Sequence, residues 1–373
     1  MRIHRRELLR QFGTAAAATA VCPMILETTS VASDSGERLI RLNRNESAYG
    51  PSEKAKVAFQ EALAEVNRYP GEDVENLRST LATSHGVATD CITLGCGSTE
   101  LMRMAAEAYL GPGKTLVAAS PTFELIAQAA ALVGADVRSV PLTREYAHDL
   151  GAMFARAQGT TGLIYICNPN NPTGTLTPET NLEAFLRKVP AGVTVMMDEA
   201  YHEYVAPTNA YASWASRAAA HSQLIVTRTF SKMYGIAGLR VGYAVSSAAT
   251  AKRLAERRLP MEVSSIATGV ALAALSDAAY TKKIAAANAN DRQEFFNQVN
   301  ARMLRCLDSH ANFVLMRTES PGKEVVETLR SKGVLVSAGF ASFEKHIRVS
   351  LGLPQDMEAF WRAWDVLMPH HPM

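Results

Sequence analysis

Two charged residues follow strand-like apolar runs directly, at positions where their side chains could do chemistry. Asp198 comes after the run at 193–197, and Lys232 lies in a turn just beyond the run at 223–227. A third such run leads into 168–174, which is rich in Asn, Pro and Gly. A buried carboxylate needs a partner for its charge, and a lysine can hold a carbonyl compound as an imine. Taken singly, the three features also fit a salt bridge or helix cap, a solvated lysine and a Pro/Gly turn.

These apolar runs belong to a pattern in which short strands alternate with helices. Helical periodicity covers 52–66, 74–85 and 98–110. The predicted strands are 115–119, 136–140, 162–167, 193–197, 223–227 and 240–245. The pattern predicts an α/β fold with a mostly parallel sheet covered by helices on both faces. Ligands bind where the strands of such sheets end, which is where Asp198 and Lys232 are placed.

The C-terminal part repeats the pattern on a smaller scale. A long helical stretch at 263–307 is followed by strands at 313–316, 334–337 and 347–351 and by helices at 322–332 and 355–367. This predicts a smaller α+β domain. We therefore expect an N-terminal arm at 33–66, a large domain at 67–262 and a small C-terminal domain at 263–373.

Length, charge and cysteine content exclude several classes of protein. The chain has 373 residues, of which 47% are hydrophobic, so it is neither disordered nor a small single-core module. Its 38 basic and 36 acidic residues leave a net charge of +2, which argues against a nucleic-acid partner. The five cysteines are dispersed, with no Cys/His cluster at the spacing of zinc ligands, so we expect no metal site.

The first residues differ in composition from the rest of the chain. Arg5 and Arg6 precede an apolar stretch that runs to Leu26, and residues 30–32 offer a small-residue cleavage site. This arrangement is typical of a secretory leader, and the paired arginines fit the twin-arginine (Tat) type. We therefore expect a signal peptide at 1–32 and a periplasmic or otherwise exported mature chain without a membrane span. The alternative is an Ala-rich N-terminal helix of a cytoplasmic enzyme.

Several sequence motifs occur in a fixed order, each behind a strand-like run. They are NPNNPTG at 168–174, DEAY at 198–201, TFSK at 229–232 and GLRVGY at 238–243. Together they resemble the class I and II pyridoxal-phosphate aminotransferases of fold type I. Four further runs look specifically like the histidinol-phosphate aminotransferase subfamily: LNRNE at 42–46, YGPS at 49–52, RYP at 68–70 and GCGSTE at 95–100. The resemblance extends from about residue 39 to the C-terminus.

The resemblance implies pyridoxal 5'-phosphate as the cofactor and gives its ring five neighbours. Lys232 would hold the cofactor as an imine and, once displaced by the substrate amine, would move the α-proton. Asp198 would keep the pyridine nitrogen protonated, and that nitrogen would be the partner that a buried carboxylate requires. Asn171 and Tyr201 would hydrogen-bond to the phenolate oxygen of the ring. Phe123 would stack on the ring face, although it also fits a position in the core.

The resemblance also implies which residues bind the cofactor phosphate. Gly97, Ser98 and Thr99 open a helix whose N-terminal amides would face the phosphate. Ser231 and Arg240 match the remaining phosphate ligands.

One residue of this set implies a partner chain. Tyr69 looks like the tyrosine that reaches the phosphate from the other subunit in this family. We therefore expect a homodimer with shared active sites.

Substrate recognition is expected around Arg348. It matches the arginine that binds a substrate α-carboxylate as a bidentate fork, with Tyr49 and Asn171 beside it. Ser337 stands where the subfamily typically carries an arginine for the substrate phosphate. Because neutral hydroxyls hold a dianion poorly, we expect an L-amino acid or related amine without a phosphate as donor and a 2-oxo acid as acceptor.

The same residues leave other reactions open. The cofactor stabilises the same carbanion in an amino acid oxidase or hydroxylase, a decarboxylase and a racemase. A non-catalytic pyridoxal-phosphate-binding protein is a further alternative. Stoichiometric consumption of a keto acid would single out transamination.

Overall fold

The structure, a computed structural model, describes residues 39–208, 210–258 and 263–367. The expected signal peptide at 1–32 lies outside these residues. Within the described ranges no helix is long and apolar enough to cross a membrane. The cysteines in this part of the chain are free thiols: Cys91, Cys96, Cys167 and Cys306.

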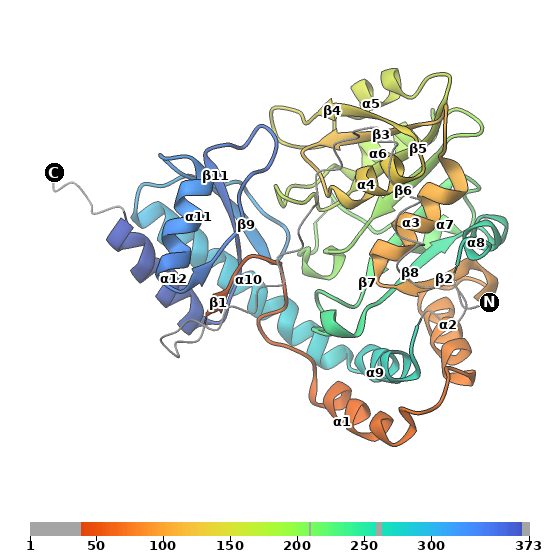
Figure 1. Ribbon diagram of the computed structural model, residues 1–373, viewed down its shortest axis with the longest axis horizontal. Coiled ribbons are helices and arrows are strands. Elements are labelled where there is room, and N and C mark those ends of the chain that lie inside the picture. The colour runs from red at the N-terminus through yellow and green to blue at the C-terminus, as the bar shows by residue number, and fades with distance from the viewer. Residues whose placement is uncertain (1–38, 209, 259–262, 368–373) are drawn as a thin grey trace, which may run out of the picture. The chain divides into compact units, whose positions relative to one another are not determined.

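A seven-stranded sheet organises the larger part of the chain (Figure 1). In spatial order its strands are β2 (Ile92–Cys96), β8 (Val241–Ser246), β7 (Leu224–Thr229), β6 (Thr194–Asp198), β5 (Thr161–Cys167), β3 (Thr115–Ser120) and β4 (Asp136–Pro141). The strands from β7 to β4 run parallel, whereas β8 is antiparallel to both β7 and β2. The mostly parallel sheet is thus confirmed. Sequence analysis missed β2, a short run that ends in Gly95 and Cys96.

Helices surround this sheet because both of its faces are apolar. They are α1 (Glu53–Ala62), α2 (Glu72–His85), α3 (Ser98–Tyr109), α4 (Leu125–Leu132), α5 (Leu150–Arg156), α6 (Glu179–Leu186), α7 (Ala215–Ala218), α8 (Ala248–Ala255) and α9 (Ser265–Leu275). Along β5, Leu163 and Tyr165 belong to one buried cluster and Ile164 and Ile166 to another, as the two-residue period of a strand requires. Each such aliphatic side chain stabilises the fold by about 1.5–3 kcal/mol. Short 3-10 turns complete this part: η2 (Leu63–Glu65), η3 (Thr89–Cys91), η4 (His202–Tyr204) and η5 (Ala237–Leu239).

The C-terminal elements form a second, smaller layer (Figure 1). Strands β9 (Phe313–Arg317) and β11 (His346–Ser350) pair antiparallel, and helices α10 (Ala278–Ala301), α11 (Gly322–Ser331) and α12 (Pro354–Leu367) accompany them. The N-terminal strand β1 (Ile40–Arg41) joins this layer by pairing in parallel with β10 (Val334–Leu335). The first described residues therefore lie beside the last elements of the chain.

The expected N-terminal arm and the span expected to form the small domain pack against elements from other parts of the chain. Helix α9 falls in the span assigned to the small domain, yet it packs against α1 and α2, and Ala267, Val270 and Ala271 join the core of the large sheet. Because α9 is apolar on nearly every side, its sequence gives no sign of which core covers it. The division of the chain into two domains stays a prediction.

Candidate functional site

A buried carboxylate stands at the carboxyl end of β6. Asp198 is 2% exposed, and its Oδ2 accepts a hydrogen bond from the Tyr165 hydroxyl at 2.8 Å. Its Oδ1 accepts from the Thr227 hydroxyl at 3.3 Å and from the Ala200 amide at 3.2 Å. Burial raises the pKa of Asp198 to about 6, and these three donors oppose that rise because they bind the ionised form. The site thus holds a carboxylate that a neighbouring cation would keep charged.

Lys232 lies in the turn that follows the next strand, β7. Its Nζ donates to the backbone oxygen of Arg44 at 3.0 Å and lies 5.7 Å from the centre of the Tyr201 ring. Burial and then the positive charge of Arg348 lower the pKa of Lys232 to about 8. A lysine amine with a lowered pKa is uncharged more often at neutral pH, as a nucleophile or base must be.

One amide connects the expected substrate arginine to the expected ring tyrosine. Asn171 Oδ1 accepts from Arg348 Nη1 at 2.5 Å, and Asn171 Nδ2 donates to the Tyr201 hydroxyl at 3.4 Å. The Arg348 guanidinium lies near the rings of Phe313 and Phe340, with its Cζ 5.5 and 5.3 Å from their centres. Its Nε has no hydrogen-bond partner. A buried guanidinium with an unused donor is suited to a carboxylate ligand.

The N-terminus of α3 and a nearby arginine form a cradle for an anion. Helix α3 begins at Ser98 behind Gly97, whose φ is +76°. A Cβ on Gly97 would lie 2.2 Å from Arg240 Nη2, so only glycine leaves room for the guanidinium there. Arg240 Nη1 donates to the Ser231 hydroxyl at 3.2 Å. Four of the six predicted phosphate-binding residues, Gly97, Ser98, Ser231 and Arg240, therefore come together, while the side chain of Thr99 is exposed.

Three predicted residues make no hydrogen bond to this constellation, although Tyr49 packs against the apolar cluster that contains Tyr201. The side chain of Tyr69 is 83% exposed. The Tyr49 hydroxyl donates to Asp291 Oδ2 at 2.7 Å. Phe123 is partly buried and packs against the apolar cluster that α3 and α4 share, which is the structural alternative that its sequence left open. Their roles toward a ligand stay predictions.

Ser337 is tied to the backbone of the N-terminal arm. Its hydroxyl donates to the Asn43 carbonyl at 2.7 Å, and Arg348 Nη2 donates to the same oxygen at 2.8 Å. Ser337 also forms an isolated antiparallel bridge with Arg348. The two expected substrate residues are therefore neighbours.

Sequence reasoning missed two residues that contact the site. Tyr165 binds Asp198, and Asn45 Nδ2 donates to the Tyr201 hydroxyl at 3.1 Å. A signal existed for Tyr165, because a hydroxyl inside a fully buried strand needs a polar partner. Asn45 belongs to the LNRNE run, but nothing in the sequence shows that this run reaches Tyr201.

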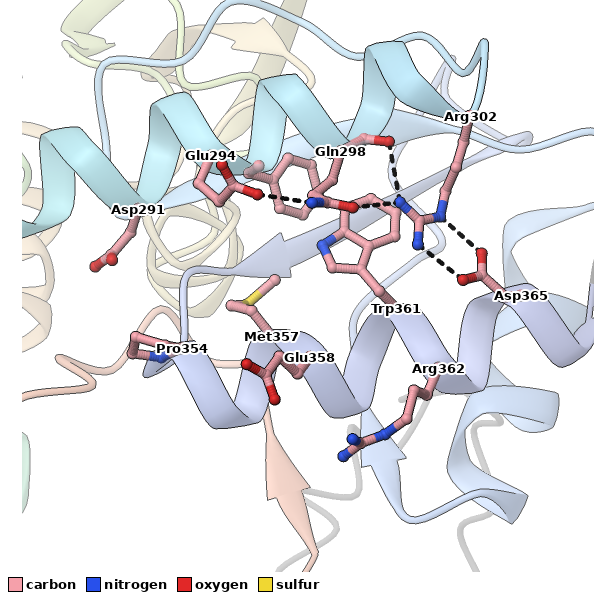
Figure 2. Close-up of a pocket in the computed structure, with 11 residues that line it drawn as sticks. Asp291, Glu294, Gln298, Arg302, Pro354, Met357, Glu358, Trp361, Arg362 and Asp365 are labelled. Carbon is pink, nitrogen blue, oxygen red and sulfur yellow. Dashed lines mark hydrogen bonds and ion pairs between the residues drawn. The ribbon is translucent and has the colours of Figure 1, made fainter.

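A separate hollow of about 520 Å3 lies between α10 and α12 (Figure 2). Asp291 and Glu294 of α10 and Glu358 of α12 line it, and Arg302 forms a two-pronged ion pair with Asp365. No predicted site residue lines it, although Asp291 also binds the Tyr49 hydroxyl. The hollow is distinct from the constellation around Lys232.

The constellation fits pyridoxal phosphate, the cofactor that the sequence motifs imply. Arg240, Ser231 and the α3 amides would hold the phosphate, Asp198 the pyridine nitrogen, and Tyr201 with Asn171 the phenolate oxygen. When bound, the cofactor supplies an electron sink for the substrate α-carbon. The chain itself supplies a base at Lys232 Nζ and a carboxylate-binding cation at Arg348. Together these groups can carry amino-group transfer.

Comparisons with known proteins agree with this reading. The family model described as "Aminotransferase class I and II" matches residues 37–363. The chain is 40% identical to histidinol-phosphate aminotransferase 1 of Cupriavidus pinatubonensis, over 87% of each chain, and 34% identical to the histidinol-phosphate aminotransferase of Bacillus subtilis, over 86% of this chain and 89% of the relative. The crystal structure of histidinol-phosphate aminotransferase from Sinorhizobium meliloti in complex with pyridoxal-5'-phosphate has a TM-score of 0.85 at 26% identity, covering 95% of this chain and 99% of that one.

Proposed function

This chain belongs to the class I and II aminotransferases and is a pyridoxal-phosphate-dependent aminotransferase of fold type I, and we propose that histidinol phosphate is its amine donor and a 2-oxo acid its acceptor. The names of relatives 34–40% identical over most of the chain support this donor. The observation that supports the acceptor is the buried Arg348 guanidinium, whose Nη1 and Nη2 donate to Asn171 and Asn43 and whose Nε has no partner, so that a cation with an unused donor is held in place for a carboxylate.

A second donor class is favoured by Ser337. A phosphate dianion is best held by a cation, and the Ser337 hydroxyl is neutral and already donates to Asn43. An L-amino acid without a phosphate needs only the guanidinium of Arg348. The relatives' names weigh against this second class, and the residue at position 337 supports it.

Competition between donors tests the proposal. The purified chain, loaded with pyridoxal phosphate, is mixed with histidinol phosphate, histidinol or single L-amino acids, and the cofactor absorbance is followed before and after a 2-oxo acid is added. We expect histidinol phosphate to convert the absorbance fastest, and the 2-oxo acid to restore it. Faster conversion by an unphosphorylated amino acid would overturn the donor. Release of ammonia, peroxide or carbon dioxide without consumption of the 2-oxo acid would overturn transamination.

We also propose a homodimer with shared sites. Large apolar side chains are exposed along and just beyond α1: Val57, Phe59, Leu63, Val66 and Tyr69. A Lys232→Ala chain and a Tyr69→Ala chain can be co-refolded and assayed together. About half of the dimers formed from equal amounts are mixed. If Tyr69 serves the partner's site, each mixed dimer carries one intact site out of two, so activity recovers to about a quarter of the wild-type value. No recovery, with both variants folded, would contradict the shared site.

Export by the Tat route is proposed from the N-terminal sequence alone. Residues 1–38 fused to a reporter should carry it across a bacterial inner membrane only while Arg5 and Arg6 are intact. The matched variant replaces both with lysine, which keeps the charge. Equal export of both fusions, or no export of either, would contradict a Tat-type leader.

A further inference from the structure

We propose that Asn45 is a positioning residue that polarises the Tyr201 hydroxyl and aims its proton at the cofactor. The inference rests on the proposed function, because it assumes that Tyr201 contacts the phenolate oxygen of pyridoxal phosphate. Asn45 Nδ2 donates to the Tyr201 oxygen at 3.1 Å, and the two side chains are 1% and 4% exposed. Buried polar contacts of this kind are strong because water does not compete for them.

The orientation of the Asn45 amide follows from its other contacts. The Asn45 backbone amide donates to Ser350 Oγ at 2.8 Å, and the Ser350 hydroxyl donates to Asn45 Oδ1 at 3.1 Å. Because Oδ1 is thereby occupied, the NH2 group is the end that faces Tyr201. An NH2 group can only donate, so the Tyr201 oxygen must accept from it.

A second amide acts on the same oxygen. Asn171 Oδ1 is occupied by Arg348 Nη1, and Asn171 Nδ2 donates to the Tyr201 hydroxyl at 3.4 Å. A phenol oxygen accepts two hydrogen bonds and donates one. With both acceptor positions filled, the proton of Tyr201 has to point away from Asn45 and Asn171, toward an acceptor in the site.

The backbone at position 45 is shaped for this contact. Asn45 has a φ of +53°, in the left-handed region that asparagine adopts more readily than most residues. Asn312 Nδ2 donates to the Asn45 carbonyl at 3.1 Å and to the Glu46 carbonyl at 3.2 Å, which fixes the turn from the other side. Burial raises the pKa of Tyr201, whereas the hydrogen bond from Asn45 lowers it.

The test uses Asn45→Gly, since glycine keeps the positive φ without the amide. The absorbance of bound pyridoxal phosphate is measured as a function of pH. The quantity compared between variants is the midpoint, the pH at which the absorbance lies halfway between its acidic and basic values. A weaker hydrogen bond from Tyr201 stabilises the phenolate less, so the midpoint should rise by about half a unit. In a Tyr201→Phe background the same substitution should leave the midpoint unchanged. Asn312→Ala, which loosens the turn without touching Tyr201, is the control and should also leave it unchanged.

Three results would overturn the inference: no shift in Asn45→Gly, an equal shift in the Tyr201→Phe background, or an equal shift in Asn312→Ala. Thermal melting of each variant establishes that it is folded. Failure of the proposed function looks different. In that case Tyr201→Phe alone would not move the midpoint, or the wild-type chain would not form the absorbing cofactor complex that Lys232→Ala should lose.

Discussion

Asn171 Oδ1 accepts a hydrogen bond of 2.5 Å from Arg348 Nη1, although the two residues are 177 positions apart in the chain. The same amide donates to Tyr201 through its nitrogen. One side chain therefore joins the guanidinium expected to bind the substrate carboxylate to the phenol expected to bind the cofactor ring. A carboxylate bound by Arg348 Nη1 would share that donor with Asn171, so we expect substrate binding to alter the hydrogen bond from Asn171 to Tyr201.

Replacement of Arg348 should separate substrate binding from cofactor binding. Arg348→Lys keeps the charge but loses the planar fork, so the KM for the 2-oxo acid should rise about 10–100-fold, as expected for loss of a charged hydrogen bond. The absorbance of bound cofactor should persist. Steady-state kinetics and a cofactor titration measure the two quantities.

Arg302→Lys is the matched control for that experiment. Arg302 also makes a two-pronged contact, with Asp365 at 2.7 Å, but it lies between α10 and α12. The KM of Arg302→Lys for the 2-oxo acid should equal that of the wild type. A similar rise in both variants would mean that Arg348 acts through stability and not through the substrate.

Gly97→Ala should weaken cofactor binding. The new Cβ would meet Arg240 Nη2 at 2.2 Å, and the backbone at φ +76° and ψ 166°, a region that essentially only glycine adopts, would be strained by about 1–3 kcal/mol. Arg240 must then move from the phosphate cradle, and we expect the dissociation constant of pyridoxal phosphate to rise at least about tenfold, the loss of one charge-assisted hydrogen bond. Gly86→Ala shares the positive φ but meets nothing within 4 Å, so it should lose stability without losing cofactor affinity. Equal affinities for Gly97→Ala and wild type would contradict the cradle.

Most strands of the large sheet could be predicted because its central strands, β5, β6 and β7, are buried on both faces. A run such as 193–197 is apolar except for Thr194, and its end at Asp198 is marked by an abrupt change in polarity. β2 escaped prediction because it ends in glycine and cysteine and not in a clearly apolar run. The partner of α9 escaped because a helix that is apolar all round carries no directional information.

Some residues of the candidate site could likewise be predicted from the sequence, and others could not. Lys232, Asp198 and Arg348 lie in motifs that match those of a known family, so the resemblance could assign a role to each of them. The carbonyls of Asn43 and Arg44 bind Arg348 and Lys232 through backbone atoms, which any residue supplies. Asn45 reaches Tyr201 across 156 positions. Contacts of this kind depend on tertiary placement, which periodicity does not encode.

Tyr165→Phe should raise the pKa of Asp198. The phenol donates to Asp198 Oδ2 at 2.8 Å and thereby favours the ionised carboxylate, whose pKa burial has already raised to about 6. Loss of one donor should move the acidic limb of the profile of pyridoxal-phosphate affinity against pH to higher pH by about 0.5–1 unit, because Asp198 of the cofactor-free chain must be ionised to bind a protonated pyridine. Tyr243→Phe, a buried phenol that binds His85, is the control. An unmoved limb in Tyr165→Phe would mean that Thr227 and Ala200 suffice.

The lowered pKa of Lys232 predicts a cost in stability for the cofactor-free chain. Burial and the charge of Arg348 lower that pKa from 10.5 to about 8, so between these two values the unfolded chain holds a proton that the native chain has lost. The free energy of unfolding therefore rises with pH across this window, and below pH 8 the native state carries a charge that its surroundings disfavour. Lys232→Met removes the group, and it should stabilise the cofactor-free chain by about 1–2 kcal/mol at pH 7 after allowance for solvent screening and for the lost bond to Arg44. The advantage should shrink steadily above pH 8 and vanish near pH 10.5, as urea unfolding at a series of pH values would measure. Parallel stability profiles for the two chains would show that Lys232 has an ordinary pKa in the native state.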